Sequence, residues 1–200
     1  LLSENHLEVI KKQGKLGNLI TALNGNNFNS PIGLGHIRWA THGAPTDANA
    51  HPHVDCQHKI AIVHNGIIEN MNELKAMLES EGHKFTSQSD SELFAHLIEK
   101  YYQPGQLTEA VKKTLSVVRG AYGLGVLSAD EPDKIVAARL GSPLVLGIVP
   151  EGGYLIASDV TAILSFTKEV VYLEEGEVVE VRAYKYALSD GKNALISRQS

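Results

Sequence analysis

Short apolar segments separated by glycine, proline or polar residues recur along the chain and predict β-strands. Each segment is ten residues long or shorter and is rich in isoleucine, valine and leucine. The last two segments flank a Glu-Glu-Gly sequence, so we expect them to form a hairpin. The predicted strands are residues 32–41, 59–68, 121–128, 134–141, 143–149, 153–159, 169–173 and 177–181.

Three helices are predicted in the middle of the chain, at residues 70–81, 89–102 and 108–119. Apolar residues recur there every three or four positions, which gives each helix one apolar face. Gly82 follows the first helix, as glycine often does at a helix end. The second helix opens with Ser-Asp-Ser-Glu, a capping pattern. The apolar faces contain Met71, Leu74, Met77, Leu78, Leu93, Phe94, Leu97, Ile98, Tyr101, Val111, Leu115 and Val118.

Strands precede and follow this group of helices, and strand and helix do not alternate regularly. This order predicts a layered α+β fold rather than a doubly wound parallel sheet. We expect one domain over residues 1–184. The apolar periodicity fades after Tyr184, so residues 185–200 are expected to be a domain end or the start of a linker.

Composition and charge narrow the class of protein. The 200 residues are enough for a hydrophobic core, and 43% hydrophobic with 20% charged residues is typical of globular domains. A net charge of −5 disfavours nucleic-acid binding, and no apolar run reaches the roughly 18–20 residues of a membrane-spanning helix. The single cysteine, Cys56, excludes an internal disulfide and a CxxC metal site and fits a cytoplasmic protein.

Six of the nine histidines lie between positions 36 and 64, in a predicted strand-rich region. His51 and His53 flank a proline and could hold a metal ion. Neither a cysteine pair nor an HExxH helix accompanies them, so we favour structural or substrate-positioning roles over metal binding. The six histidines are His36, His42, His51, His53, His58 and His64.

Asn65 and Gly66 follow the apolar run Ile-Ala-Ile-Val and His64. An asparagine side chain and a glycine backbone N–H are the kind of paired donors that form an oxyanion hole in acyl transfer. Asn-Gly is also a strong hairpin-turn signal, and taken alone the turn is the simpler interpretation.

Arg38 and Asp90 could together recognise an α-amino acid. Asp90 lies where a helix begins, which favours its ionised form and would allow it to bind an ammonium group. Arg38 could bind a carboxylate through two hydrogen bonds. The alternatives are a solvated aspartate and a surface ion pair.

Read together, several segments resemble the class II glutamine amidotransferase domain of the glucosamine-6-phosphate synthase family, the isomerising glutamine–fructose-6-phosphate transaminases. The resemblance spans about residues 14–184. Amidotransferases that make phosphoribosylamine or asparagine are less similar at RWATHG and HNGIIEN. The matching segments, in order, are HIRWATHG, NAHPH, VHNGIIEN, SQSDSE, RGAYGLGV, ARLGSPLVLG, IASD and LEEGEV.

The resemblance implies an N-terminal-nucleophile hydrolase fold, a four-layer αββα sandwich of two antiparallel sheets. It implies hydrolysis of L-glutamine to glutamate and ammonia. The ammonia would pass to a sugar-phosphate isomerase domain, which makes glucosamine 6-phosphate from fructose 6-phosphate without a metal or organic cofactor. It also implies a homodimer in the full-length enzyme, with no nucleic-acid or membrane partner.

The family motifs assign Asn65 and Gly66 to the oxyanion hole. They assign Arg38 to the glutamine carboxylate and Asp90 to its α-ammonium group. The resemblance further implies that Thr41 and His42 line the glutamine pocket and that Trp39 lies near its exit.

The family's nucleophile is an N-terminal cysteine on the first strand of the fold, and residues 1–200 contain neither. Because the free amine of that cysteine also acts as the base, we expect residues 1–200 alone to be inactive. Cys56 matches no family motif and is not expected to replace it. The alternatives are a non-catalytic glutamine-binding module, another class II amidotransferase such as an amidophosphoribosyltransferase, and a histidine-bound metal hydrolase.

Overall fold

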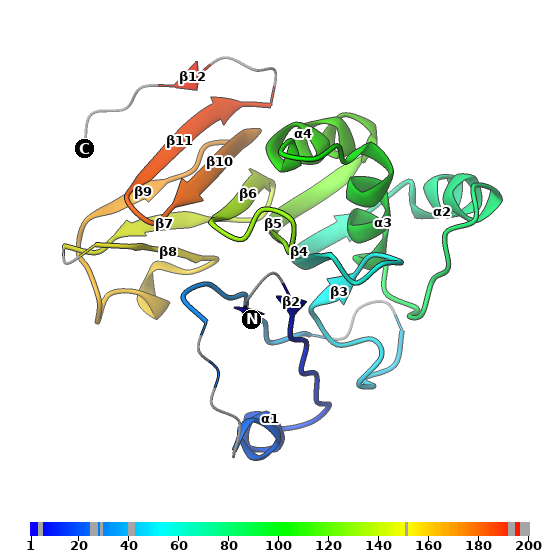
Figure 1. Ribbon diagram of the computed structural model, residues 1–200, viewed down its shortest axis with the longest axis horizontal. Coiled ribbons are helices and arrows are strands. Elements are labelled where there is room, and N and C mark those ends of the chain that lie inside the picture. The colour runs from blue at the N-terminus through cyan, green and yellow to red at the C-terminus, as the bar shows by residue number, and fades with distance from the viewer. Residues whose placement is uncertain are drawn as a thin grey trace.

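A seven-stranded antiparallel sheet forms the centre of the molecule (Figure 1). The computed structural model describes residues 1–3, 6–24, 28, 30–39, 43–150, 152–191 and 195–196. The strand order is β12-β11-β10-β6-β5-β4-β3. The strands are β3 (His53–Val54), β4 (Ile60–Ile68), β5 (Gly120–Ser128), β6 (Lys134–Leu140), β10 (Glu177–Arg182), β11 (Lys185–Asp190) and β12 (Leu195–Ile196).

β4 and β5 are the longest strands and pair along their whole length, from Ile60 opposite Ser128 to Ile68 opposite Gly120. Side chains alternate between the two faces of a strand, and here both faces are covered. Ile60 and Ile62 therefore belong to the core cluster beneath the helices. Ala61 points to the other face, where it clusters with Leu2 and Leu7 of the N-terminal segment.

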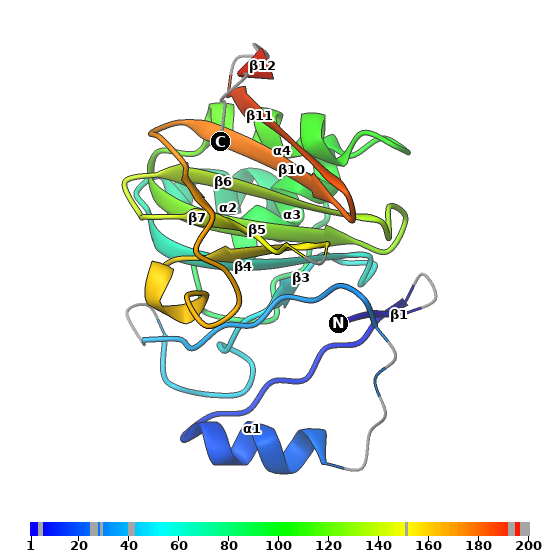
Figure 2. The same cartoon turned by 90° about the vertical axis from the view of Figure 1, so that its left-hand side faces the viewer.

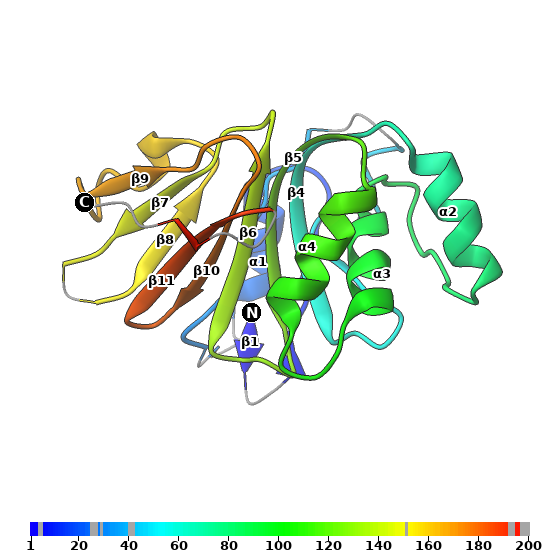
Figure 3. The same cartoon turned by 90° about the horizontal axis from the view of Figure 1, so that it is seen from above.

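Helices α2 (Met71–Ser80), α3 (Glu92–Tyr101) and α4 (Leu107–Val117) cover one face of this sheet (Figure 3). All three agree with the helices predicted from the sequence. Their apolar faces meet the sheet in the largest core cluster, in which Phe94 and Leu97 are fully buried.

A three-stranded sheet, ordered β8-β7-β9, packs against the other face. Its strands are β7 (Val145–Ile148), β8 (Tyr154–Ala157) and β9 (Val170–Tyr172), and a short 3₁₀ helix, η1 (Val160–Ala162), follows β8. Both sheets are antiparallel, which confirms the α+β class. Three of the four expected layers are present in the described residues: the helices α2–α4, the large sheet and the small sheet.

The hairpin predicted for residues 169–181 is wrong. β9 pairs with β7 in the small sheet, whereas β10 pairs with β6 and β11 in the large one. The intervening segment is held at the end of β6, because Gly176 N donates to Arg139 O (2.8 Å) and Glu175 accepts from Arg139 Nη2 (3.0 Å). The turn therefore crosses between the sheets instead of returning along one.

The N-terminal third differs most from the prediction. The described part of segment 32–41, residues 32–39, is extended but makes only one isolated bridge, between Ile32 and Leu2. Three further elements there were not predicted: β1 (Leu2–Ser3), β2 (His6–Leu7) and helix α1 (Leu16–Leu23). Helix α1 buries none of its residues and lies apart from the other helices (Figure 2).

Near the other end, β11 occupies residues that the sequence assigned to a domain end or linker. It pairs with β10 at every position from Lys185 to Asp190, so the sheet continues past residue 184. Its apolar residues are few, with Leu188 buried and the rest mainly polar or exposed, which explains why the pattern is weak.

Candidate functional site

Asn65 and Gly66 lie inside a strand, not in a turn. Within β4 they are opposite Gly123 and Tyr122 of β5, and the strand continues for two more residues to Ile68. The hairpin-turn interpretation is therefore wrong, and Asn65 and Gly66 are held in a regular strand, the next to last of the large sheet.

The backbone at Gly66 requires a glycine. Its φ is +139°, and a Cβ added there would lie 2.0 Å from Ala121 O. Such a contact is far inside van der Waals distance, so a side chain would force the strands apart. Gly66 itself is exposed, which leaves its backbone accessible from outside.

β4 has an unpaired edge beside this pair. β3 covers only Ala61 and Ile62 of β4, and the described residues place no strand next to the rest of that edge. Ile68 N points toward this edge, where it donates to Asp90 Oδ2 (3.0 Å). Backbone N–H groups point to alternate edges along an antiparallel strand. Because Gly66 is two residues from Ile68, its N–H faces the same edge.

Asp90 is buried, with 4% of its surface exposed, and it lies in the turn two residues before α3 begins at Glu92. The solvated-aspartate interpretation is therefore wrong. Its hydrogen bond to Ile68 N holds one carboxylate oxygen two residues along β4 from Gly66. The Asp90 carboxyl group thus lies beside the edge that the N–H of Gly66 faces.

His36 orients the Asn65 side chain. Its Nε2 lies 2.9 Å from Asn65 Oδ1. Burial lowers the pKa of His36, so its ring stays neutral and can donate this bond from Nε2. With Oδ1 accepting from His36, Asn65 presents its Nδ2 hydrogens in another direction.

Arg38 is connected to Asp90 through a short series of contacts. Its guanidinium donates to Gly43 O (3.3 Å) and Ala44 O (3.4 Å). Asn49 Nδ2 donates to the same Ala44 O (2.9 Å), and Asn49 Oδ1 accepts from Gln88 N (2.8 Å), two residues before Asp90. Hydrogen bonds through Ala44, Asn49 and Gln88 thus connect the half-buried Arg38 with the turn that contains the buried Asp90.

The remaining predicted pocket residues are less informative. Trp39 is 88% exposed, so the described structure gives it no packing role. Thr41 and His42 lie outside the described residues.

His64, one of the six histidines for which the sequence favours structural or positioning roles, connects three segments next to the predicted site. Its Nδ1 lies 2.8 Å from Ser91 Oγ and its Nε2 lies 3.3 Å from Ala121 O. It therefore ties β4 to the start of α3 and to β5, next to Asn65 and Asp90. Its place in the sequence His-Asn-Gly was the available signal, but its partners are distant in the chain.

The histidine group near this site consists of neutral, packed rings. The ring centres of His36 and His51 are 4.0 Å apart, and those of His51 and His53 are 4.7 Å apart. Burial lowers the pKa of His51 strongly and that of His53 to about 3. These tilted and edge-to-face ring contacts support the structural interpretation of these residues.

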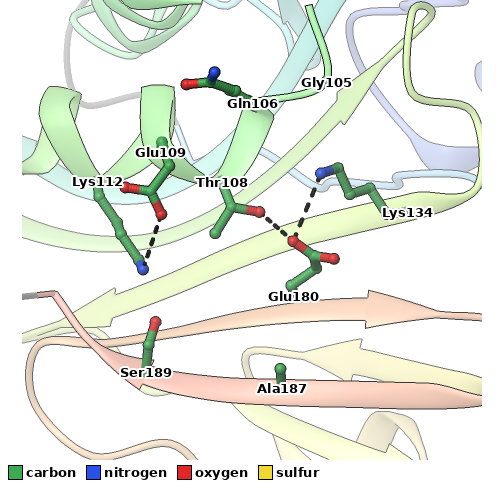
Figure 4. A pocket seen from close by; sticks show the side chains of 9 residues that line it. All are labelled: Gly105, Gln106, Thr108, Glu109, Lys112, Lys134, Glu180, Ala187 and Ser189. Atoms are coloured by element: carbon green, nitrogen blue, oxygen red, sulfur yellow. Dashed lines mark hydrogen bonds and ion pairs between the residues drawn. The ribbon is translucent and has the colours of Figure 1, made fainter. Parts of the chain in front are cut away.

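One cavity borders the site, and a second lies away from it. One of about 120 Å³ is lined partly by His36 and Arg38 together with the segment before α1. A larger one of about 270 Å³ lies between α4 and strands β6, β10 and β11 (Figure 4). Its charges pair with one another, as Lys134 does with Glu180 (3.6 Å), and it contains none of the predicted site residues.

Comparison with known proteins points to one family. The sequence model of the family described as “Glutamine amidotransferase domain” matches residues 18–196. The chain is 47% identical over 181 residues to the glutamine–fructose-6-phosphate aminotransferase (isomerizing) of Aquifex aeolicus, covering 90% of this chain and 30% of that protein. It is 50% identical over 175 residues to the protein of that name from Thermotoga maritima, covering 87% and 28%. The chain thus spans about 30% of the length of these relatives.

Two solved structures share the fold. The glutamine phosphoribosylpyrophosphate amidotransferase of B. subtilis, complexed with ADP and GMP, superposes with a TM-score of 0.64 and 26% identity. An allosteric regulatory enzyme of purine biosynthesis gives 0.65 and 27%. Each match covers 80% of this chain and 35% of the other. The likeness confirms the predicted N-terminal-nucleophile hydrolase fold. Among the described residues, no helix has the length and apolar character needed to cross a membrane.

Proposed function

Because this chain belongs to the glutamine amidotransferase family, we propose that it is a glutaminase domain, which hydrolyses L-glutamine to glutamate and ammonia. The observation that carries the proposal is the arrangement on β4. The N–H of Gly66 faces the same strand edge as the buried carboxylate of Asp90, and the neighbouring Asn65 side chain is oriented by His36.

The oxyanion hole stabilises charge that develops during amide cleavage. When a thiolate attacks the side-chain amide of glutamine, the carbonyl oxygen becomes negative. Asn65 Nδ2 and Gly66 N–H donate to that oxygen, and such preorganised donors typically contribute about 3–4 kcal/mol each to lowering the barrier. The attacking thiolate belongs to the family's N-terminal cysteine, which is not among residues 1–200.

Recognition of the amino-acid end rests on charge. The carboxylate of Asp90 accepts the α-ammonium group, and the guanidinium of Arg38 binds the α-carboxylate. Thr41 and His42 line the pocket, and Trp39 lies at its exit. Glutamine is then held at both ends, with the reacting amide at the donors of β4.

We assign the whole protein to amino-sugar synthesis in the cytoplasm. It transfers the ammonia to fructose 6-phosphate in a separate isomerase domain, and it functions as a homodimer. This assignment rests on relatives of 43–50% identity that carry the aminotransferase name. The structural neighbours of purine synthesis share only 26–27% identity, so the phosphoribosyl alternative is less well supported.

The test is Asn65→Ala in the enzyme that carries this domain together with its N-terminal cysteine. We expect the glutaminase kcat to fall about 10²–10³-fold with a smaller change in KM, because the donor acts mainly in the transition state. Ammonia and glutamate release are measured, with thermal unfolding as the control for folding. An unchanged kcat would remove Asn65 from the mechanism. If the unmodified enzyme formed phosphoribosylamine in place of glucosamine 6-phosphate, the protein would be an amidophosphoribosyltransferase and the assignment to amino-sugar synthesis would be wrong.

A further inference from the structure

Four metal-ligating side chains lie outside the residues proposed to bind glutamine, where β3, α2 and α3 meet (Figure 1). Cys56 follows β3, His83 follows α2, and His96 and Glu99 are one turn apart on α3. One potential ligand atom of each lies within 4.8 Å of those of the other three. In the part of the chain that the structure describes, no other three histidine, cysteine or acidic side chains converge in this way.

The contacts within this group of four side chains all involve the same four atoms: Cys56 Sγ, the Nδ1 atoms of His83 and His96, and Glu99 Oε2. Cys56 Sγ lies 3.8 Å from His83 Nδ1 and 3.5 Å from His96 Nδ1. Glu99 Oε2 lies 3.0 Å from His83 Nδ1 and 3.5 Å from His96 Nδ1. Tetrahedral zinc has bonds of about 2.0–2.3 Å to such atoms, which places them about 3.3–3.8 Å from one another. Four of the six edges of the tetrahedron thus already have nearly the required length.

We propose that Cys56, His83, His96 and Glu99 bind one structural Zn²⁺ ion. A thiolate, two imidazoles and a carboxylate form a donor set that suits zinc, whereas magnesium and calcium prefer oxygen ligands. The thiolate and the carboxylate also balance the charge of the ion. The site is structural and takes no part in the glutaminase reaction.

Hydrogen bonding alone accounts for only part of this arrangement. An ion pair between His83 and Glu99 explains one contact of 3.0 Å. Each imidazole Nδ1 faces both Cys56 Sγ and Glu99 Oε2 but can carry only one proton, so the contacts of 3.5–3.8 Å are at most weak hydrogen bonds beside it. A shared ion explains all four positions together.

The surroundings support the proposed ligands. His96 is 1% exposed, and its other nitrogen, Nε2, has no hydrogen-bond partner but faces Glu92 Oε1 at 3.7 Å. A carboxylate behind a ligating imidazole is a common outer contact of zinc sites. Cys56 N donates to Glu99 Oε2 (3.2 Å) and so fixes that carboxylate. Cys56 is exposed, which gives an ion access from solvent.

The ion would close chain loops between residues as far apart as Cys56 and Glu99, which are 43 positions apart in the sequence. Closing such loops with a metal restricts the unfolded chain and stabilises the fold. Glu92, behind His96, also accepts hydrogen bonds from Thr86 and Ser87 at 2.6–2.7 Å. The metal site is thereby continuous with the segment that leads to Asp90.

The experiment uses the untagged full-length protein, first stripped with a chelator and then dialysed against Zn²⁺. Bound zinc is measured by elemental analysis, and affinity by competition with a colorimetric chelator. Cys56→Ser and His83→Gln are the test variants because neither residue is fully buried. His6→Gln, which alters an exposed histidine outside the cluster, is the matched control. Circular dichroism verifies that each variant is folded.

We expect close to one zinc ion per chain in the unmodified protein and the control, with a higher midpoint of thermal unfolding when zinc is bound. Each test variant should weaken zinc binding by more than about 100-fold, since even outer-contact mutations cost 10- to 100-fold. Co²⁺ should give a sulfur-to-cobalt charge-transfer band that Cys56→Ser abolishes. A folded protein that retains no zinc, or an affinity and cobalt spectrum unchanged by Cys56→Ser, would overturn the proposal. Neither result would alter the glutaminase assignment, which is tested separately through Asn65.

Discussion

Both the backbone conformation and the proposed oxyanion hole require a residue without a side chain at position 66. We expect Gly66→Ala to lower the free energy of unfolding by roughly 2–4 kcal/mol, because the new Cβ would lie 2.0 Å from Ala121 O at a φ of +139°. Chemical denaturation measures this loss. Gly17→Ala is the matched control, since a Cβ there meets no atom within 4 Å inside α1 and should stabilise by up to about 1 kcal/mol. Equal effects of the two substitutions would contradict the close contact.

Asp90 is expected to contribute to binding rather than to the chemical step. Asp90→Asn should weaken glutamine binding by roughly 2–5 kcal/mol, seen as a raised KM, because it removes one charge of a desolvated pair. The variant should also discriminate less against analogues that lack the α-amine. Asp130→Asn, which removes an exposed carboxylate paired with Lys59, is the control and should leave KM unchanged. If the variant still rejects those analogues as strongly as the unmodified enzyme, Asp90 does not bind the ammonium group.

At the scale of elements, helices α1 and α3 differ in how much they contribute to the core: α3 is largely buried, and α1 buries none of its residues. Leu97 of α3 is fully buried, whereas Ile20 of α1 is 51% exposed. We expect Leu97→Ala to cost about 2–5 kcal/mol of unfolding free energy and Ile20→Ala to stay within about 0.5 kcal/mol. Urea denaturation of both variants gives the comparison. A similar loss at Ile20 would show that α1 packs against a surface.

The elements that the sequence predicted well are those whose own periodicity determines them. The helices around Leu74, Leu97 and Val111 bury a continuous apolar face, so their pattern is strong. The hairpin at 169–181 was wrong because a strand's partner is chosen by the tertiary fold, and Arg139 holds the connection elsewhere. Residues 32–39 show the strand pattern but form only the isolated bridge of Ile32 with Leu2 among the described residues.

For the candidate site too, the sequence predicted local features but not the contacts between distant segments. Arg38, Asn65, Gly66 and Asp90 were recognisable as residue types suited to binding an amino acid and stabilising an oxyanion. The contacts that position them join distant segments, as in the hydrogen bond of Asn65 with His36, and no local pattern encodes these. The four proposed zinc ligands also lack a recognisable spacing, because they come from three separate segments.

For the whole molecule, the buried histidines predict how stability depends on pH. Burial lowers the pKa of His53 to about 3 and shifts those of His36, His51 and His64 in the same direction. The unfolded chain takes up these protons near pH 6.5, so it binds more protons than the folded state below that pH. The stabilisation is therefore complete above about pH 6.5 and is lost progressively as the pH falls toward 3.

We expect the free energy of unfolding to decrease between about pH 7 and about pH 5, with a slope of up to about 1.4 kcal/mol per pH unit for each proton. Denaturant titrations at several pH values measure the slope. His53→Gln should reduce it by up to one proton, whatever its effect on the absolute stability. A stability that stays constant over this range would show that these rings titrate alike in both states.

Among the described residues, no strand pairs with β4 beside Gly66, and this has a consequence for how the sheet can evolve. An exposed strand edge usually invites a further strand, from the same chain or from a neighbour, and proteins protect themselves by covering it. Here a covering strand would occupy the N–H of Gly66 and displace the bond from Ile68 N to Asp90. If these groups bind glutamine, the catalytic requirement limits the width of the sheet at this edge, and the risk of aggregation there has to be countered by something other than a pairing strand.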